Sequence, residues 1–463
     1  MARLFGTDGV RGLAGRDITA ELAVDLAAAA ARVLGGNRAP GVGAPRALIG
    51  NDSRISGGYL TAAVAAGLAG AGVDVLDVGV LPTPGLAYLV ATQDVDLAVM
   101  LSASHNPMAD NGIKFFARGG FKLPDTVEDL IEASLREPWE RPTGESVGRI
   151  RTDHLAPLAY VDHLVDAAPV RLAGLKIVLD CANGAASEVA PEVMRRLGAD
   201  VVPLACTPDG LNINAGVGST HPEMLRRAVV REAADLGFAF DGDADRCLAV
   251  DDAGDLVDGD RIMAILAIAM KERGALANNT LVATVMSNLA LHHAMRDAGI
   301  ELRATDVGDR YVLEDMLAGG YTLGGEQSGH VIMTEFGTTG DGVLTAVQVA
   351  SQLALTGRTM AQLASVIQPL PQVLVNVAGV DKARVETDAG VARALADARE
   401  RLGDMGRILL RPSGTEPLVR VMVEAATYEM ATEVAGALAD AVREHLTLAD
   451  TGPVAVPTRT VPS

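Results

Sequence analysis

The feature that most constrains the fold of this chain is a regular alternation of short apolar runs with helical segments. In the first third of the sequence the expected elements follow one another in the order strand 46–50, helix 59–71, strand 73–78, a helix opened by Pro82 and Pro84, and strand 96–101. A further helix is expected at 19–34, with Thr19 as its N-cap. This βαβαβ order is the signature of a mostly parallel sheet with helices on its faces.

The same rhythm returns twice along the chain. A second unit runs from a strand at 175–180 to a strand at 236–240, and a third from a strand at 280–285 to a strand at 321–323. These units share no residue-level identity, so any repeat is one of architecture. Beyond a breaker at 368–371 the expected order changes to strand 373–377, helix 389–402, strands 408–410 and 418–423, and helix 428–445. This last order predicts a smaller α+β domain.

A chain of 463 residues exceeds what one hydrophobic core usually organises, so we expect several domains. The expected fold class is α/β, with three α/β mixed-sheet domains plus a smaller C-terminal α+β domain. We place the domains at 1–153, 154–256, 257–370 and 371–449, followed by a flexible tail at 450–463.

Charge and composition argue against several classes of partner. The formal net charge is −20 and the sequence pI is about 4.8, so nucleic acid and anionic membrane surfaces would repel the chain. The alanine-rich segment 20–34 carries Glu21, Asp25 and Arg32, which is typical of a helix in a water-soluble protein and not of a membrane span. Three cysteines without a CxxC pair suit a reducing compartment, and the N-terminus lacks the apolar core of a signal peptide. We therefore expect a cytoplasmic protein.

The sharpest chemical signal is Asp-Gly-Asp-Ala-Asp-Arg at 241–246, which lies between two strand-like runs. The carboxylates of Asp241, Asp243 and Asp245 alternate with small residues, so they can converge on one hard cation such as Mg²⁺. An EF-hand is excluded because Arg246 stands at the position of its glycine. A solvated acidic turn is the alternative.

A second signal is Ser-Ala-Ser-His-Asn-Pro at 102–107, which follows the apolar run 96–101 and ends on the turn signal Asn-Pro. In open α/β sheets, ligands bind at the ends of such strands. A serine in this place can act as a nucleophile or as a phosphate carrier, and an ordinary Ser/Asn turn is the alternative.

Two more loops carry groups that suit a phosphorylated sugar. In the glycine-rich turn 324–330, Glu326, Ser328 and His330 can meet sugar hydroxyls, and His330 can transfer a proton near neutral pH. The stretch 411–417 offers two hydroxyls, a glycine and a guanidinium group, which together can bind a phosphate. A simple β-turn is the alternative for this stretch.

Two weaker candidates lie in glycine-containing loops. Arg11 is the lone arginine of the stretch 5–12. Gly308 and Asp309 belong to a similar stretch at 307–310, where Asp309 can equally be a helix N-cap.

Together these motifs resemble the α-D-phosphohexomutase superfamily. The resemblance rests on five motifs in order: 5–12, 102–107 with 111–116, 241–246, 324–330 and 411–417. One such motif would be weak evidence, whereas five in this order are specific. The residues of the first motif, Phe-Gly-Thr-Asp-Gly-Val-Arg-Gly, and Gln327 favour the glucosamine branch over the mannose and glucose mutases.

The resemblance implies a heart-shaped, four-domain molecule, either a monomer or a homodimer. It implies reversible conversion of glucosamine 6-phosphate to glucosamine 1-phosphate, on the route to UDP-N-acetylglucosamine and the cell wall. The hexosamine phosphate is the expected partner, with Mg²⁺ as cofactor and glucose or glucosamine 1,6-bisphosphate as primer. Neither nucleic acid nor a membrane is expected as a partner.

The resemblance also implies roles for individual residues. Ser104 would be the phosphoserine, and Asp241, Asp243 and Asp245 would hold Mg²⁺ together with a phosphoryl oxygen on Ser104. His105, next to Ser104, would either orient the phosphoserine or contact its phosphate. Around the reacting phosphoryl group the resemblance places four residues: Arg11, Lys114, Arg246 and His330. Of these, His330 or Lys114 would carry the proton.

The remaining roles implied by the resemblance concern substrate binding. Sugar contacts would come from Glu326 and Ser328, with Gly308 and Asp309 close by. The phosphate that is not being transferred would be held by Arg411, Ser413, Gly414, Thr415 and Arg420.

Three alternative functions stay open at this level. A phosphomannomutase or phosphoglucomutase differs only in the group that it accepts at C2 of the sugar. A metal-dependent phosphatase with a serine nucleophile would release inorganic phosphate and need no primer. A module that only binds a metal or a sugar phosphate would not need five reactive loops.

Overall fold

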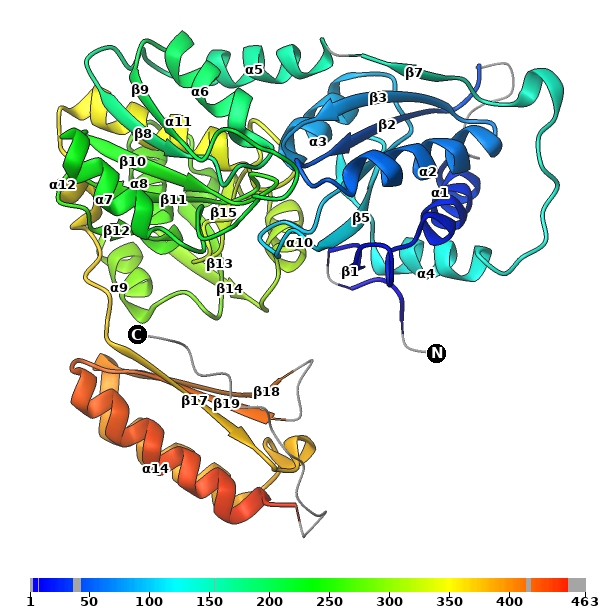
Figure 1. Cartoon of the computed structure of the whole chain (residues 1–463). Coiled ribbons are helices and arrows are strands. Elements are labelled where there is room, and N and C mark those ends of the chain that lie inside the picture. Colours follow the sequence, from blue (N-terminus) through cyan, green and yellow to red (C-terminus); the bar gives the residue numbers. More distant parts are fainter. Residues whose placement is uncertain (1–2, 7, 36–42, 154, 414–417, 449–463) are drawn as a thin grey trace. The chain divides into compact units, whose positions relative to one another are not determined.

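A computed structural model describes residues 3–6, 8–35, 43–153, 155–413 and 418–448 (Figure 1). The expected tail at 450–463 lies outside the described residues. The chain divides into two compact units, a larger one from residues 1–287 with 294–367, and a smaller one from 288–293 with 368–463. The larger unit contains three β-sheets and the smaller unit contains one.

The first sheet has the strand order β1-β5-β4-β2-β3-β7, with β6 paired to β5. Its strands are β1 (Val10–Leu13), β2 (Arg46–Asn51), β3 (Asp74–Val80), β4 (Leu97–Leu101), β5 (Asp110–Ala117), β6 (Phe121–Lys122) and β7 (Ile150–Thr152). β2 is parallel to β3 and β4, and β3 is parallel to β7, whereas β5 is antiparallel to β1, β4 and β6. The sheet is therefore mixed, and the expectation of a mostly parallel sheet holds only for the half β4-β2-β3-β7.

Helices cover both faces of this sheet. They are α1 (Ala20–Leu34), α2 (Gly57–Gly70), α3 (Thr83–Thr92) and α4 (Asp125–Ser134). α1 and α2 lie side by side (Figure 1) and share one core with Ile49 of β2, while the next residue, Gly50, faces Leu86 of α3 on the opposite side. This alternation follows from the two-residue period of a strand. The expected N-cap is confirmed, because the side chain of Thr19 accepts a hydrogen bond from the Leu22 N–H.

The second and third sheets have the orders β12-β11-β10-β8-β9 and β14-β13-β15-β16. Their strands are β8 (Lys176–Asp180), β9 (Asp200–Leu204), β10 (Leu236–Phe240), β11 (Cys247–Asp251), β12 (Leu256–Val257), β13 (Thr280–Thr284), β14 (Glu301–Thr305), β15 (Leu323–Gly325) and β16 (Val331–Met333). The helices from here to the breaker are α5 (Ala156–Asp166), α6 (Ala186–Arg196), α7 (Glu223–Glu232), α8 (Gly259–Glu272), α9 (Leu289–Asp297), α10 (Asp309–Gly319), α11 (Gly342–Thr356) and α12 (Met360–Ala364).

The three sheets of the larger unit share one arrangement of strands, which supports a repeat of architecture. Each contains a strand with a parallel partner on one side and an antiparallel partner on the other, and the antiparallel partner is the next strand in the chain. The strands with both kinds of partner are β4, β10 and β15, and their antiparallel partners are β5, β11 and β16, respectively. The loop that joins each pair leaves the carboxyl end of a parallel strand and reverses sharply. Such loops are the places where open α/β sheets bind ligands.

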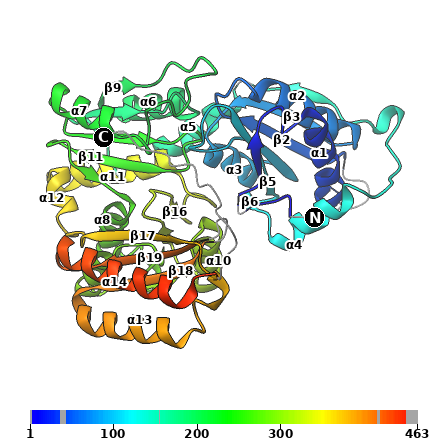
Figure 2. The ribbon, with the colours of Figure 1, turned by 60° about the horizontal axis from the view of Figure 1, so that its bottom comes forward.

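The smaller unit is built on an antiparallel sheet of order β17-β19-β18. Its elements are β17 (Gln372–Ala378), α13 (Ala389–Leu402), β18 (Arg407–Pro412), β19 (Leu418–Glu424) and α14 (Tyr428–Leu446). The two helices lie next to each other against the sheet (Figure 2). This confirms the expected α+β order of the C-terminal part and, with the three α/β sheets, the expected fold class.

The sequence-based prediction differs from the structure in places that have a physical explanation. The strand expected at 321–323 lies at Leu323–Gly325, because Gly324 and Gly325 pair with β13 while Tyr321 precedes the strand. Helices α5, α8 and α11 were not predicted. Residues 342–353 of α11 are all buried, so this helix lacks the polar face that reveals a helical period. No helix among the described residues combines the length and the apolar character needed to cross a membrane.

Candidate active site

The three loops that follow β4, β10 and β15 meet in the larger unit. We call them the serine loop (102–109), the aspartate loop (241–246) and the histidine loop (326–330). Ser104 of the serine loop is 1% exposed and has a left-handed backbone, with φ of 51°. Its hydroxyl donates a hydrogen bond to a carboxylate oxygen of Asp241, and His105 Nδ1 lies 3.4 Å from the same Oγ. The sequence-predicted serine and the first predicted metal ligand are therefore in direct contact.

The aspartate loop is a buried cluster of carboxylates. One oxygen each of Asp241, Asp243 and Asp245 lie within 4.8 Å of one another. Among the described residues, Asp243 Oδ1 and Asp245 Oδ1 are buried without a hydrogen-bond partner. Burial, together with the nearby charges of Asp245 and Asp243, raises the pKa of Asp241 well above its ordinary value. Unpartnered carboxylate oxygens that repel one another are the ligands that a hard divalent cation would satisfy, so the residues fit Mg²⁺.

Gly242 lets the two loops approach each other closely. A Cβ atom at this position would lie 2.5 Å from the backbone carbonyl oxygen of Ser104, which no side chain allows. The glycine between the first two aspartates is therefore needed for the contact between the serine loop and the aspartate loop.

Lys114, on β5, brings a buried cation to the cluster. Its Nζ lies 2.7 Å from Asp243 Oδ2 and 2.9 Å from Asp8 Oδ2. Burial opposes its charge, but Asp243 and Asp8 outweigh this and raise the pKa of Lys114 above its ordinary value. Thr83 also donates to Asp243 Oδ2, at 2.6 Å, so this oxygen is fully engaged while Oδ1 is not.

The two arginines expected near the phosphoryl group, Arg11 and Arg246, stand at the edge of the cluster. The Arg11 guanidinium forms an ion pair with Asp8, and the backbone N–H of Arg246 donates to Asp241 Oδ1 at 3.2 Å. Both side chains are partly exposed, and the Nε of each is buried without a hydrogen-bond partner among the described residues. Such unsatisfied guanidinium donors suit an anion.

His330, in the histidine loop, lies between two carboxylates. Its Nδ1 is 3.7 Å from Asp245 Oδ2 and its Nε2 is 3.5 Å from Asp309 Oδ2. Burial opposes protonation of the ring, but Asp245 and Asp309 raise the pKa of His330 above its ordinary value. The Gly340 N–H donates to Nε2 at 3.1 Å, so in the neutral ring the proton sits on Nδ1 and faces Asp245.

The other predicted sugar-binding residues divide into two groups. Ser328 Oγ donates to Glu326 Oε2 at 3.3 Å, so these two side chains present one polar surface in the histidine loop. Asp309 instead forms a partly buried ion pair with Lys122. The alternative that Asp309 is a helix N-cap is wrong, because Gly308 is the N-cap of α10 and Asp309 is its first residue.

Two site residues escaped the sequence analysis. Asp8 pairs with Lys114 and Arg11, and also with Lys122 Nζ at 2.8 Å. Burial opposes this charge, but the cations, Lys114 first, hold the pKa of Asp8 well below its ordinary value. Asp8 stands inside the first motif, which is a local signal. Lys122 has no local signal, since its partners are 114 and 187 residues away.

The smaller unit carries the remaining predicted residues. Arg411 of β18 and Arg420 of β19 are direct cross-strand partners, so their side chains leave the same face of the sheet. Like charges in this position are destabilising unless an anion or a carboxylate compensates them. Ser413 is buried, and its carbonyl accepts a hydrogen bond from Lys382. Gly414 and Thr415 lie outside the described residues.

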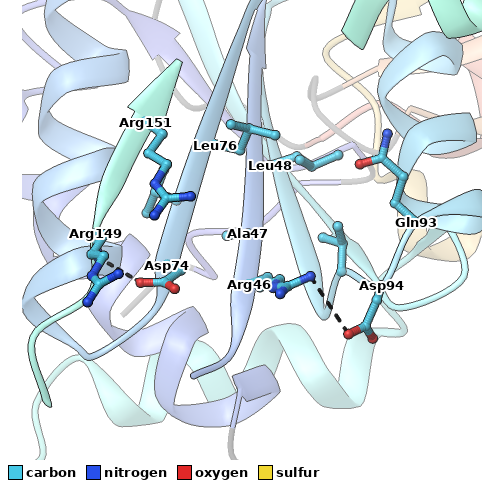
Figure 3. Close-up of a pocket in the computed structure, with 11 residues that line it drawn as sticks. Arg46, Ala47, Leu48, Asp74, Leu76, Gln93, Asp94, Arg149 and Arg151 are labelled. Atoms are coloured by element: carbon cyan, nitrogen blue, oxygen red, sulfur yellow. Dashed lines mark hydrogen bonds and ion pairs between the residues drawn. The ribbon is translucent and has the colours of Figure 1, made fainter. Parts of the chain in front are cut away.

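A cavity of about 300 Å³ lies at the opposite edge of the first sheet (Figure 3). Its charged lining comes from Arg46, Asp74, Asp94, Arg149 and Arg151. Arg46 and Asp74 are the first residues of β2 and β3, whereas the serine loop follows the last residue of β4. β4 spans five residues, about 17 Å at ~3.3 Å per residue, so this cavity is not part of the site.

Comparison with known families matches nearly the whole chain. Four family models match in chain order, described as Phosphoglucomutase/phosphomannomutase alpha/beta/alpha domain I at residues 2–141, domain II at 158–254, domain III at 258–370, and C-terminal domain at 374–441.

Curated relatives are similar over almost their full length. A protein of Paenarthrobacter aurescens, named phosphoglucosamine mutase, is 62% identical over 446 residues, which cover 96% of this chain and 98% of the relative. A protein of the same name from Acidothermus cellulolyticus is 62% identical, with 96% of each chain covered.

Solved structures share the fold. A phosphoglucomutase/phosphomannomutase family protein of Burkholderia thailandensis has a TM-score of 0.81 at 25% identity, with 96% of this chain and 99% of that chain covered. Aspergillus fumigatus N-acetylphosphoglucosamine mutase, solved in complex with GlcNAc-6P and magnesium, has a TM-score of 0.67 at 18% identity, with 95% of each chain covered. At that identity the likeness concerns the fold alone.

Proposed function

The chain belongs to the phosphoglucomutase/phosphomannomutase family, and we propose that within it the chain interconverts glucosamine 6-phosphate and glucosamine 1-phosphate. The choice of substrate is supported by relatives named phosphoglucosamine mutase that are 60 to 62% identical over nearly the whole chain. It agrees with the sequence-based expectation from the first motif and Gln327. We place the reaction in the cytoplasm, in agreement with three cysteines that form no CxxC pair and suit a reducing compartment.

One observation carries the proposal. The hydroxyl of Ser104 is hydrogen-bonded to Asp241 inside a cluster of three buried aspartates, two of which have an oxygen without a hydrogen bond among the described residues. A serine hydroxyl alone is a weak nucleophile, whereas a phosphoserine in this place already carries the group to be transferred. Phosphoryl transfer then needs positioning and charge neutralisation, which the surrounding cations offer.

Ser104 is the phosphoryl carrier in this proposal. In the first half-reaction the bond between phosphorus and Ser104 Oγ breaks, a bond forms to O1 of the sugar, and the O1 proton leaves to a base. In the second half the 6-phosphoryl group of the bisphosphate moves to Ser104 Oγ, and O6 takes up a proton. Glucose or glucosamine 1,6-bisphosphate would prime the unphosphorylated enzyme.

Asp241, Asp243 and Asp245 would hold Mg²⁺ with a phosphoryl oxygen on Ser104, and the ion would supply neutralisation of the phosphoryl charge. Arg11 and Arg246 would approach the same phosphoryl group with their unsatisfied Nε donors. His105, next to Oγ, would orient it.

The proton role falls to His330 rather than Lys114. Two carboxylates raise the pKa of Lys114 above its ordinary value, so this side chain stays charged and acts as an electrostatic group. In this proposal His330 takes the proton at Nε2, which lies near Asp309 and must first give up the hydrogen bond from the Gly340 N–H, while Nδ1 faces Asp245. An imidazole with a carboxylate at each nitrogen is suited to taking a proton and giving it back within one cycle.

Substrate binding is proposed from two places. Glu326 and Ser328 would contact the sugar hydroxyls, with Gly308 and Asp309 shaping the adjoining helix terminus. The phosphate that is not reacting would be bound by residues of the smaller unit, namely Arg411, Ser413, Gly414, Thr415 and Arg420. Two cross-strand arginines are the feature that supports an anion there.

A coupled assay with the 6-phosphates of glucosamine, glucose and mannose tests the substrate. With Mg²⁺ and a bisphosphate primer present, the highest kcat/KM is expected for glucosamine 6-phosphate. Equal or better turnover of mannose 6-phosphate would contradict this choice and favour a phosphomannomutase. Release of inorganic phosphate without any isomerisation would favour a phosphatase.

A further inference from the structure

The backbone of the serine loop is bonded by a buried arginine that the proposed chemistry does not use. Arg54, two residues after Asp52 at the end of β2, is 2% exposed. Its Nη2 donates to the carbonyl oxygens of Ser104 and Asn106, both at 2.9 Å. Its Nη1 donates to the carbonyl of Pro107 in the same loop and to that of Asp110, the first residue of β5. One guanidinium group thus donates to three carbonyl groups of the serine loop and to the first carbonyl of the strand that follows it.

A second residue, from another part of the chain, donates to two of the same carbonyls. Asn214 lies in the loop between β9, a strand of the second sheet, and the helix α7. Its Nδ2 donates to Ser104 O at 2.8 Å and to Asn106 O at 3.1 Å. The carbonyls of Ser104 and Asn106 are therefore each shared by Arg54 and Asn214. Because Asn214 belongs to the part of the chain that carries the aspartate loop, it connects the serine to the metal ligands.

Asp52 completes this network at the N–H side of Ser104. The Arg54 Nε donates to Asp52 Oδ2 at 2.9 Å, and the Ser102 hydroxyl donates to the same oxygen at 2.7 Å. The Ser102 Oγ in turn accepts from the Ser104 N–H at 2.9 Å. Both peptide groups of Ser104 are thus held, in a left-handed conformation that a serine rarely adopts.

We propose that Arg54 and Asn214 are positioning residues, which form a shared carbonyl clamp that fixes the direction in which Ser104 presents its phosphoryl group. This proposal rests on the proposed role of Ser104 as the phosphoryl carrier. Neither side chain is bonded to Ser104 Oγ, so both act through the backbone. Transfer requires the attacking oxygen, the phosphorus and Oγ in line, and a displacement of about 1 Å can cost roughly 100-fold in rate.

Single-turnover transfer separates positioning from a merely structural role. The enzyme is loaded at Ser104 from ³²P-labelled glucose 1,6-bisphosphate, freed of excess label, and mixed with glucosamine 6-phosphate. Only folded, phosphorylated molecules contribute to the signal. Loss of folded protein therefore lowers the amplitude, whereas misalignment of the serine loop lowers the rate constant.

The variants are chosen to remove donors without straining the backbone. Asn214 has φ of 56°, so Asn214→Gly removes both hydrogen bonds at no backbone cost, and Asn214→Asp keeps the shape but faces the two carbonyls with oxygen. Arg54→Lys keeps the positive charge but lacks the planar guanidinium group that donates to several carbonyls at once. The matched control is Asn212→Asp in the same loop, where Nδ2 donates only to Thr207 O, at 3.0 Å.

The expected rate constant falls about tenfold in Asn214→Gly, further in Asn214→Asp, and about 100-fold in Arg54→Lys, while Asn212→Asp stays within about twofold of the parent. Reduced amplitude with an unchanged rate constant in the Asn214 variants would overturn the clamp, and so would unchanged transfer. If Arg54→Lys does not fold, the two Asn214 variants decide alone. Absence of labelled Ser104 in the parent enzyme would instead overturn the proposed function, and the clamp with it.

Discussion

Both edges of the first sheet carry charged side chains, but these side chains differ in burial and in their partners. At the carboxyl edge, Ser104 and Lys114 are almost fully buried, and Lys114 bonds carboxylates from two other segments of the chain. At the amino edge, the arginines of the cavity in Figure 3 are exposed, and Arg46 comes only within 4.0 Å of Asp94. An ion pair of this exposed kind contributes little energy, because water and salt screen it.

The difference shows that charge alone does not make a catalytic site in this fold. Burial at the carboxyl edge makes every unpaired oxygen or nitrogen expensive, so such atoms persist there only if something binds to them. Among the described residues, Asp243 Oδ1, Asp245 Oδ1 and the Nε atoms of Arg11 and Arg246 have no hydrogen-bond partner, although Arg246 Nε lies 3.9 Å from Asp245 Oδ1 as a long ion pair. The predictions that follow test this contrast between the edges.

The largest effect is expected from Ser104→Ala. Because the phosphoryl carrier is lost, kcat should fall by at least about 10⁴-fold, and intact-mass measurement should no longer find the fraction that is heavier by one phosphoryl group. Arg151→Ala, at the amino edge, is the matched control and should keep both. An active and unmodified Ser104→Ala enzyme would refute the carrier role.

The next effect concerns the metal. Removal of divalent cations with EDTA should lower the activity about 10³-fold, and added Mg²⁺ should restore it. Asp243→Asn should weaken Mg²⁺ binding, measured by calorimetry, since one of its oxygens has no other partner. Asp74→Asn at the amino edge should leave the Mg²⁺ affinity unchanged. Full activity after metal removal would contradict this prediction.

A smaller effect is expected from the two ion pairs of Lys122, which connect Asp8 with Asp309. Lys122→Met leaves Asp8 and Asp309 without a shared cation, so the free energy of unfolding should fall by about 3 kcal/mol, and kcat/KM should fall with it. Adding Asp309→Asn should recover part of the stability, because one buried charge is then removed. Denaturant unfolding measures the free energy of unfolding of the single and of the double variant. If the double variant is no more stable than Lys122→Met alone, the ion pair between Lys122 and Asp309 does not contribute this energy.

The smallest effect is expected at the amino edge itself. The double change Arg149→Ala and Arg151→Ala removes two exposed side chains of the cavity, and the free energy of unfolding should change by no more than about 0.5 kcal/mol. Steady-state kinetics should give kcat and KM within about twofold of the parent. A larger change in KM would show that this edge takes part in substrate binding after all.

Local signals in the sequence were sufficient for much of the fold and for the identity of the reactive loops. The strand at 236–240 and the helix at 389–402 agree with the structure residue for residue, because capping residues, breakers and apolar runs define them locally. Helices α8 and α11 escaped prediction because helices buried on most sides have no polar face. The motif of the aspartate loop predicted three metal ligands. Their side chains can converge because the three aspartates are only two residues apart in the sequence.

The convergence of the loops was decided only by tertiary structure. Ser104 and Asp241 are 137 residues apart, and Lys122 and Asp309 are 187 apart, so no local pattern predicts either contact. The same holds for Arg54 and Asn214, whose importance comes from where their donors point and not from any motif. The sequence by itself determined which groups are available and on which loops they lie. The packing of three sheets decided which of these groups are buried together, and burial is what gives a charge or a hydrogen bond its energetic weight.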